Sequence, residues 1–219
     1  MLVNTYRRFT YFLNSKSDKL SDIFTSEVFQ NLQSEVGIHD LNVYQKDNDR
    51  FIVIDADKSL NSEKLINVIK NQRIFEGFNT LLSQLEALER IYKLDQKAIY
   101  APNEGQLKNS VEPSKRFVWT LLLEPELIDE YKRVHAMGMA WPEITANMKS
   151  VGVKDMEIYI HNTQVMLIMD TIPDFDLDEV GPKWQKLPRE EEWQAYVAKF
   201  QKTDPESSIQ EKWQDMIKL

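Results

Sequence analysis

Apolar residues in the C-terminal half fall into short strand-like runs separated by polar turns. Residues 116–123 (RFVWTLLL) are rich in β-branched, aromatic and other apolar side chains, which predicts a strand. Residues 156–160 (MEIYI) and 165–172 (VMLIMDTI) predict two further strands, and the polar tetrapeptide HNTQ between them predicts a hairpin turn. Residues 212–219 (KWQDMIKL) are expected to form a closing strand.

Two helical regions are expected between these strands. Pro125 suits the first turn of a helix, and the acidic residues around it precede Lys132 and Arg133, which is the charge order that a helix dipole favours. Residues 189–201 (REEEWQAYVAKFQ) carry apolar side chains at helical spacing. The resulting order, β-α-β-β-α-β, is that of the ferredoxin-like split βαβ unit.

The N-terminal half repeats parts of this pattern. RRFTYFL near the start resembles KRFVWTLLL, and SEVGIHDLNVY (34–44) resembles KSVGVKDMEIY (149–159). Residues 97–114 combine prolines, a glycine and polar residues without apolar periodicity, a composition typical of a linker. The sequence therefore predicts a degenerate ferredoxin-like repeat at 1–96, a linker at 97–114 and a second ferredoxin-like domain at 115–219.

The predicted fold class is α+β, with two tandem βαββαβ units packed as a pseudo-dimer of the dimeric α/β-barrel kind. A sheet of this type leaves one face uncovered by its own helices, and packing two such sheets face to face buries both faces. A homodimer is the alternative assembly. The strand positions expected between the sheets, or else their alternates, are Phe9, Tyr11, Ile52 and Ile54 in the first copy and Phe117, Trp119, Leu167 and Met169 in the second.

Composition and charge narrow the class of protein. Hydrophobic residues make up 42% and charged residues 28% of the 219 residues, a balance typical of a soluble globular protein. The apolar runs are far shorter than the roughly 18 residues that a membrane span requires, and the N-terminus lacks the pattern of a secretory signal. The net charge of -8 repels phosphate backbones. We therefore expect a cytoplasmic protein that binds neither membranes nor nucleic acid.

The sequence offers little support for a metal or a cofactor. It contains three histidines and no cysteine, lacks HExxH, and has no glycine-rich nucleotide-binding motif. Asp174, Asp176 and Asp178 alternate as in a calcium loop, but Glu179 stands where such a loop needs glycine and Gln185 where it needs glutamate. These acidic residues instead predict the N-terminal cap of a helix. No metal and no cofactor are expected.

The segment EYKRVHAMGMAWPEI (130–144) holds the strongest candidate chemistry. Tyr131 and His135 are four residues apart, so on a helix they project from one face. An imidazole exchanges protons near neutral pH, a phenol supplies a directional hydrogen bond, and the indole of Trp141 offers an apolar face to a sugar ring or a base. A packed helix end with a hydrogen-bonded histidine is the alternative explanation. His161, in contrast, belongs to the predicted HNTQ turn.

Residues 115–219 resemble the L-rhamnose mutarotase family. The resemblance rests on the strand KRFVWTLLL, the spacing Tyr-x3-His followed by WPEI, the segment K-x2-G-x2-DMEIY, the hairpin ending LIMDT, and EEWQAYVAKFQ. These elements cover nearly all of the second half, whereas the first half shares only the framework. The resemblance implies a dimeric α+β barrel of ferredoxin-like type that needs neither metal nor cofactor.

The activity that this resemblance implies is that of an isomerase, an aldose mutarotase acting on a monosaccharide. It would interconvert the α and β anomers of a 6-deoxy sugar such as L-rhamnose or L-fucose by general acid–base ring opening. His135 corresponds to the proton donor of the family. Tyr131 and Trp193 correspond to sugar contacts, and Trp141 is expected to join them. Met156 stands where the rhamnose enzyme has a sugar-contacting tyrosine.

Several alternatives stay open at this point. The group that assists His135 is Glu143, Glu157 or a bound water. Met156 and a two-residue extension before WPEI make L-fucose or another deoxy sugar a competitor to L-rhamnose. Glu27, which aligns with His135 in the first copy, is expected to play no part in catalysis. An alternative function of a different class is that of a non-catalytic α+β barrel, which binds a sugar or a partner protein and retains the site without catalysing a reaction.

Overall fold

The described residues of the chain fall into two units, each built on an antiparallel sheet. The computed structural model describes residues 5–14, 37–70, 85–202 and 212–219. Glu27 therefore lies outside the described residues. No helix within them is long and apolar enough to cross a membrane. The first unit comprises Met1–Glu89, Ala98–Ser110 and Met216–Leu219, and the second comprises Arg90–Lys97 and Val111–Asp215.

The sheet of the second unit contains the strands predicted at 116–123, 156–160 and 165–172, which are β7, β8 and β9. The single closing strand expected at 212–219 was wrong: only Gln214–Asp215 (β10) pair in this sheet, whereas Ile217–Lys218 (β11) pair in the sheet of the first unit. The strand order in the second unit is β10-β7-β9-β8-β5. The tight turn between β8 and β9 is made by the left-handed residue Asn162 (φ 52) of the HNTQ segment. The bounds are β5 Glu89–Lys93, β7 Lys115–Leu122, β8 Val153–His161, β9 Gln164–Thr171 and β10 Gln214–Asp215.

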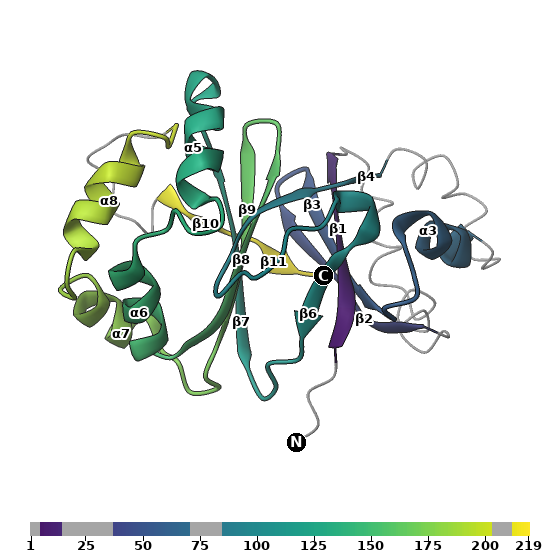
Figure 1. Cartoon of the computed structure of the whole chain (residues 1–219), viewed down its shortest axis with the longest axis horizontal. Helices are drawn as coiled ribbons and strands as arrows, with labels where there is room; N and C mark the ends of the chain where they lie inside the picture. Colours follow the sequence, from purple (N-terminus) through teal and green to yellow (C-terminus); the bar gives the residue numbers. More distant parts are fainter. Residues whose placement is uncertain (1–4, 15–36, 71–84, 203–211) are drawn as a thin grey trace. The chain divides into compact units, whose positions relative to one another are not determined.

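Helices occupy the two long connections of this unit and cover one face of its sheet (Figure 1). Asp176 caps α7 as predicted, because its carboxylate accepts hydrogen bonds from the backbone N–H groups of Asp178 (2.9 Å) and Glu179 (3.4 Å). The order of elements is β-α-β-β-α-β, so the unit is ferredoxin-like. The bounds are η4 Pro125–Leu127, α5 Ile128–His135, α6 Pro142–Ser150, α7 Leu177–Trp184 and α8 Glu190–Ala198.

The sheet of the first unit has the strand order β11-β2-β3-β1-β4, and β6 also pairs with β1. Leu65 and Ile69 of α3 pack against this sheet in the core of the unit. The bounds are β1 Thr5–Asn14, β2 Ile38–Lys46, β3 Asp49–Ala56, α3 Ser62–Lys70, β4 Glu86–Ala87, η3 Pro102–Glu104, β6 Gln106–Asn109 and β11 Ile217–Lys218.

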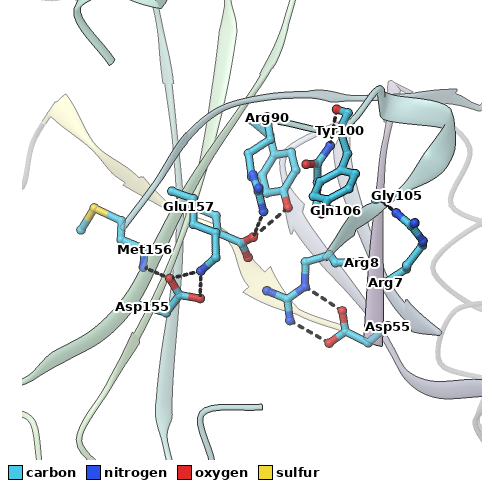
Figure 2. Close-up of polar contacts among 12 residues, drawn as sticks. Arg7, Arg8, Asp55, Arg90, Tyr100, Gly105, Gln106, Asp155, Met156 and Glu157 are labelled. Carbon is cyan, nitrogen blue, oxygen red and sulfur yellow. Dashed lines mark hydrogen bonds and ion pairs between the residues drawn. The ribbon is translucent and has the colours of Figure 1, made fainter. Parts of the chain in front are cut away.

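The two units share local details as well as strand order. In the first unit the Arg8 guanidinium forms a fork with the Asp55 carboxylate, with both N···O distances at 2.7 Å (Figure 2). In the second, Arg116 forms the corresponding fork with Asp170 at 2.7 and 3.1 Å. Strands β2 and β8 each carry a register shift near their first residue. The division into two copies around 97–114 stays a prediction, and within that segment the structure contains η3 and β6.

The strand positions named above as an interface between the sheets face the helices of their own unit instead. Phe9, Tyr11, Ile52 and Ile54 belong to one core cluster with Leu65 and Ile69 of α3. Leu167 and Met169 belong to a second cluster with residues of α5 and α8, and Phe117 and Trp119 pack against it. That placement was wrong for these residues, because side chains alternate along a strand and the helices take this face. Their alternates, such as Val53 and Ile168, are buried on the opposite face.

Candidate active site

Helix α5 brings Tyr131 and His135 together as their spacing predicted. Tyr131, Val134 and His135 form its buried stripe at positions i, i+3 and i+4. The ring centroids of Tyr131 and His135 are 4.1 Å apart. His135 is the last residue of the helix, and the chain turns away at Ala136, which has an extended conformation (φ -60, ψ 161). The helix end therefore delivers an imidazole and a phenol to one place.

The hydrogen bonding of His135 defines its tautomer. Its Nδ1 atom lies 2.8 Å from the carbonyl oxygen of Tyr131. Because a carbonyl oxygen only accepts hydrogen bonds, Nδ1 carries the ring proton and donates it. In the neutral ring, Nε2 then holds a lone pair, and it has no hydrogen-bond partner among the described residues. His135 is thus oriented as a proton acceptor.

Burial keeps this imidazole neutral at physiological pH. Only 7% of His135 is exposed, and it packs in edge contacts with Tyr92 and Trp193, at centroid distances of 6.2 and 5.7 Å. Desolvation by these neighbours lowers the pKa of His135 to about 4, although the hydrogen bond to the Tyr131 carbonyl opposes the shift. Burial raises the pKa of Tyr92 to about 12 and that of Tyr131 further still, so both phenols stay neutral.

These residues line a cavity of about 430 Å³ within the second unit. A volume in the range of roughly 300–1,000 Å³ is typical of sites for small molecules. Its walls are largely apolar and aromatic, and a few polar side chains interrupt them. Of the residues predicted to form the site, the structure places Tyr131, His135, Met156 and Trp193 in the lining.

Trp141, the remaining predicted residue, does not line the cavity. It is the residue before α6, and its indole packs edge-on against Trp193 with a centroid distance of 5.3 Å. The guanidinium of Arg189 lies 4.0 Å from the centroid of the Trp141 ring. Trp141 therefore supports the cavity wall by holding Trp193 in position, and it is not placed to contact a ligand directly.

Neither carboxylate considered as a partner of His135 lies in the cavity. Glu143 is on the surface, where it pairs with Arg189 at 3.4 Å. Glu157 is buried on the other face of β8, where its Oε1 accepts hydrogen bonds from Arg90 (2.9 Å) and Tyr159 (3.3 Å). Figure 2 shows Met156 and Glu157 pointing to opposite sides of the strand, as alternation requires. Both residues were wrong candidates for the second proton carrier.

Tyr92, Glu190 and Gln201 are among the lining residues that were not predicted from the sequence. Tyr92 comes from β5, which joins the edge of β8; the backbone N–H of Leu94 donates to the carbonyl of Met156 at 2.8 Å. Glu190 is the first of three consecutive glutamates, and only the structure distinguishes it from the other two. Gln201 follows α8, with its Oε1 buried and unpartnered among the described residues.

The second unit is thus a ferredoxin-like α+β unit with a buried histidine in the wall of an aromatic cavity. Residues 116–219 match the family described as L-rhamnose mutarotase. The match covers 104 of the 219 residues, just under half of the chain. The family relationship supports a carbohydrate isomerase of the sugar mutarotase type.

Two relatives and one solved structure are similar to this chain. An L-fucose mutarotase of Xanthomonas campestris pv. campestris is 29% identical over 99 residues, which cover 45% of this chain and 79% of that protein. A UPF0734 protein of Dictyostelium discoideum is 33% identical over 100 residues, which cover 44% of this chain and 78% of that protein. A solved structure of an anthrone oxidase-like protein has a TM-score of 0.46 at 9% identity, covering 97% of this chain and 91% of that one. That structural similarity is too low to carry a comparison of sites.

Proposed function

We propose that this protein is an aldose mutarotase that interconverts the α and β anomers of a 6-deoxy sugar such as L-rhamnose or L-fucose. The observation that carries the proposal is His135, a neutral imidazole whose Nε2 lone pair is unpartnered among the described residues. It sits in a cavity of about 430 Å³ walled by aromatic rings. Mutarotation requires proton transfer but no redox step and no covalent intermediate with the enzyme, which matches these groups.

His135 alone can carry out both proton transfers of the reaction. Nε2 accepts the proton of the C1 hydroxyl while the bond between C1 and the ring oxygen breaks and C1 becomes a carbonyl carbon. The imidazolium then returns the proton to the former ring oxygen, which becomes a hydroxyl. Rotation about C1–C2 and the reverse steps close the ring on the other carbonyl face. The family role of proton donor thus follows a first step in which His135 is the acceptor.

One nitrogen can serve both oxygens because both are attached to C1 in the closed ring. A general base must approach within roughly 2.6–3.2 Å of the proton-bearing atom. Because the two oxygens are bonded to the same carbon, a small shift of the sugar ring brings either of them within this distance of Nε2. This route removes the need for Glu143 or Glu157, which the structure places elsewhere. Of the three groups that the sequence suggested as assisting His135, a bound water molecule is the one that remains.

The shape of the proposed sugar site follows from the remaining walls. Trp193 offers an indole face against which the C–H groups of a pyranose can pack. Met156 and Ile158, neighbours on the inner side of β8, make an apolar surface suited to the methyl group of a 6-deoxy sugar. The hydroxyl of Tyr131 has no hydrogen-bond partner among the described residues and can bind a sugar hydroxyl.

The first unit is proposed to be a degenerate copy that serves as a structural partner in a monomeric pseudo-dimer. All the cavity residues belong to the second unit, including Tyr92, which precedes the 97–114 segment. Cytoplasmic localisation and the absence of nucleic-acid and membrane partners remain part of the same proposal. They rest on composition and on the net charge of -8.

Anomer exchange measured by NMR saturation transfer tests the proposal. The anomeric protons of a panel of aldoses, beginning with L-rhamnose and L-fucose, should exchange faster with the protein than without it. A deoxy sugar should show the largest acceleration, because Met156 and Ile158 give the cavity an apolar surface. No acceleration for any sugar that binds would favour the non-catalytic sugar-binding barrel instead.

The low pKa of His135 predicts how activity and stability depend on pH. Activity should be lost as the pH falls through about 4, where the imidazole becomes protonated and can no longer accept a proton. The unfolded chain takes up this proton near its ordinary pKa of about 6.5. The stabilising contribution is therefore complete above about pH 6.5 and is lost as the pH falls from there to about 4, by roughly 3 kcal/mol in total.

Urea unfolding at several pH values between 7.5 and 4.5 checks this expectation. His135→Gln removes the titrating group while leaving the other groups in place, so the variant should lose less stability on acidification than the wild type. The difference between the two proteins isolates the histidine. Parallel curves would show that the imidazole is not desolvated in the folded protein.

A further inference from the structure

Glu190 is a buried carboxylate in the wall of the His135 cavity. Only 2% of the residue is exposed, and it begins α8. The preceding residue, Arg189, has a left-handed backbone conformation (φ 63), which is uncommon for a residue other than glycine. Such a conformation persists only where surrounding contacts enforce it. Here those contacts are the stacking of Arg189 on Trp141 and its ion pairs with Glu143 and Glu192.

One oxygen of this carboxylate is fixed by two donors from other helices. Oε1 accepts hydrogen bonds from Trp184 Nε1 at 2.9 Å and from Asn147 Nδ2 at 3.0 Å. Asn147 is itself anchored, because its Nδ2 also donates to the carbonyl of Pro188 at 2.9 Å. Residues of α6 and α7 thus hold Glu190, the first residue of α8, in a single orientation.

The other oxygen, Oε2, has no hydrogen-bond partner among the described residues. Placing a carboxylate away from bulk water is costly unless its lone pairs are occupied, so this oxygen calls for a ligand or water. The helix dipole does not explain the burial. Glu191 and Glu192 lie in the same first turn, are exposed, and supply the negative charge that favours a helix N-terminus.

A second polar atom in the same wall is also unpartnered. Gln201 lines the cavity and is 7% exposed, and its Oε1 is buried without a hydrogen-bond partner among the described residues. The Glu190 carboxylate lies in a largely apolar cavity that Asp178, Gln185, Gln194 and Asp215 also line, and such a wall suits a ligand that carries several hydroxyl groups. A purely apolar ligand would leave Oε2 of Glu190 desolvated and unpaired.

We propose that Glu190 is a substrate-specificity residue whose Oε2 accepts a hydrogen bond from one hydroxyl of the sugar and so sets the orientation of the ring toward His135. The proposal rests on the mutarotase function proposed above and names the group that recognises the substrate. Glu190 acts through binding and orientation, and His135 carries the proton.

The test is Glu190→Gln in the full chain, with Glu191→Gln on the same helix as the matched control. The glutamine oxygen can keep the bonds from Trp184 and Asn147, so the fold should be retained; thermal unfolding verifies this. The amide group then replaces Oε2 and presents a donor where the sugar needs an acceptor. A hydrogen bond to a charged group changes binding by roughly ten- to hundredfold, so KM should rise by that factor. We expect kcat to stay within about threefold, as for a variant that has lost binding alone.

A series of monodeoxy analogues of the best substrate identifies the hydroxyl. For the analogue that lacks the hydroxyl bound by Glu190, wild type and Glu190→Gln should have the same KM. For every other analogue the variant should keep its penalty. This convergence is a signature that a merely structural role of Glu190 would not produce.

Other results would overturn the proposal. A fall in kcat at unchanged KM would make Glu190 a proton carrier, and unchanged kinetics would make it a structural residue only. Tryptophan fluorescence titration with the same sugars separates this proposal from the mutarotase function, because Trp184 and Trp193 line the cavity. Binding without exchange, weakened in Glu190→Gln, would reject the mutarotase but retain the recognition role. If the wild type binds none of the sugars, the recognition role is rejected.

Discussion

His135→Ala should lower the rate of anomer exchange by roughly 10²-fold or more, because general acid–base groups contribute on that scale. The variant removes the Nε2 lone pair that is proposed to take the C1 proton. Its side chain adjoins an existing cavity, so the lost volume adds to open space and does not create a new void in close-packed core. His135→Gln serves as a second variant of more similar size in case the alanine variant is unstable.

The matched control is His161→Gln, which removes the histidine at the end of β8 that does not line the cavity. Its exchange rate should equal that of the wild type. Rates are measured at pH 7 on whichever sugar shows turnover, with circular dichroism confirming the fold. If His135→Ala exchanges anomers as fast as the wild type, the histidine is a packed helix-end residue. The protein would then be better described as a binding module.

The elements that the sequence predicted well are those whose information is local. Runs rich in β-branched, aromatic and other apolar residues predicted β7, β8 and β9, and the i, i+4 spacing placed Tyr131 and His135 on one helix face. A strand, however, has two faces. When both faces are apolar, the local sequence pattern does not show which of them the helices cover. That ambiguity explains why Phe9 and Tyr11 were placed between the sheets although they pack under α3.

The parts of the site that the sequence did not reveal depend on contacts across the chain. Tyr92 reaches the cavity because β5 pairs with β8, and its own neighbourhood in the sequence carries no trace of that pairing. Glu190, Glu191 and Glu192 are identical in type, and only the donors on Trp184 and Asn147 single out the first. Glu157 was a candidate base from the sequence, but in the structure its side chain lies on the face of β8 opposite to the cavity. Such distinctions require tertiary structure.

Expressing residues 114–219 alone should abolish the well-ordered site, although this segment contains His135, Tyr131 and Trp193. The truncation removes β5 and leaves β8 with an unpaired edge. Exposed strand edges pair readily with other chains, so we expect a self-associating species in place of a monomer. Loss of Tyr92 also removes one of the aromatic rings that pack around the imidazole, since the ring centroids of Tyr92 and His135 are 6.2 Å apart.

Light scattering after size-exclusion chromatography reports the association, and NMR saturation transfer reports the exchange rate. We expect at least a tenfold loss of exchange. Even a small displacement of the imidazole moves Nε2 out of hydrogen-bond distance of the two oxygens on C1. Full-length Tyr92→Ala separates the two causes: it removes the ring but keeps β5 paired with β8. If that variant retains most activity while the truncated chain self-associates, the essential contribution of the preceding residues is the strand. A monomeric, fully active 114–219 segment would show that the second unit needs neither, and that the pseudo-dimer plays no part in maintaining the site.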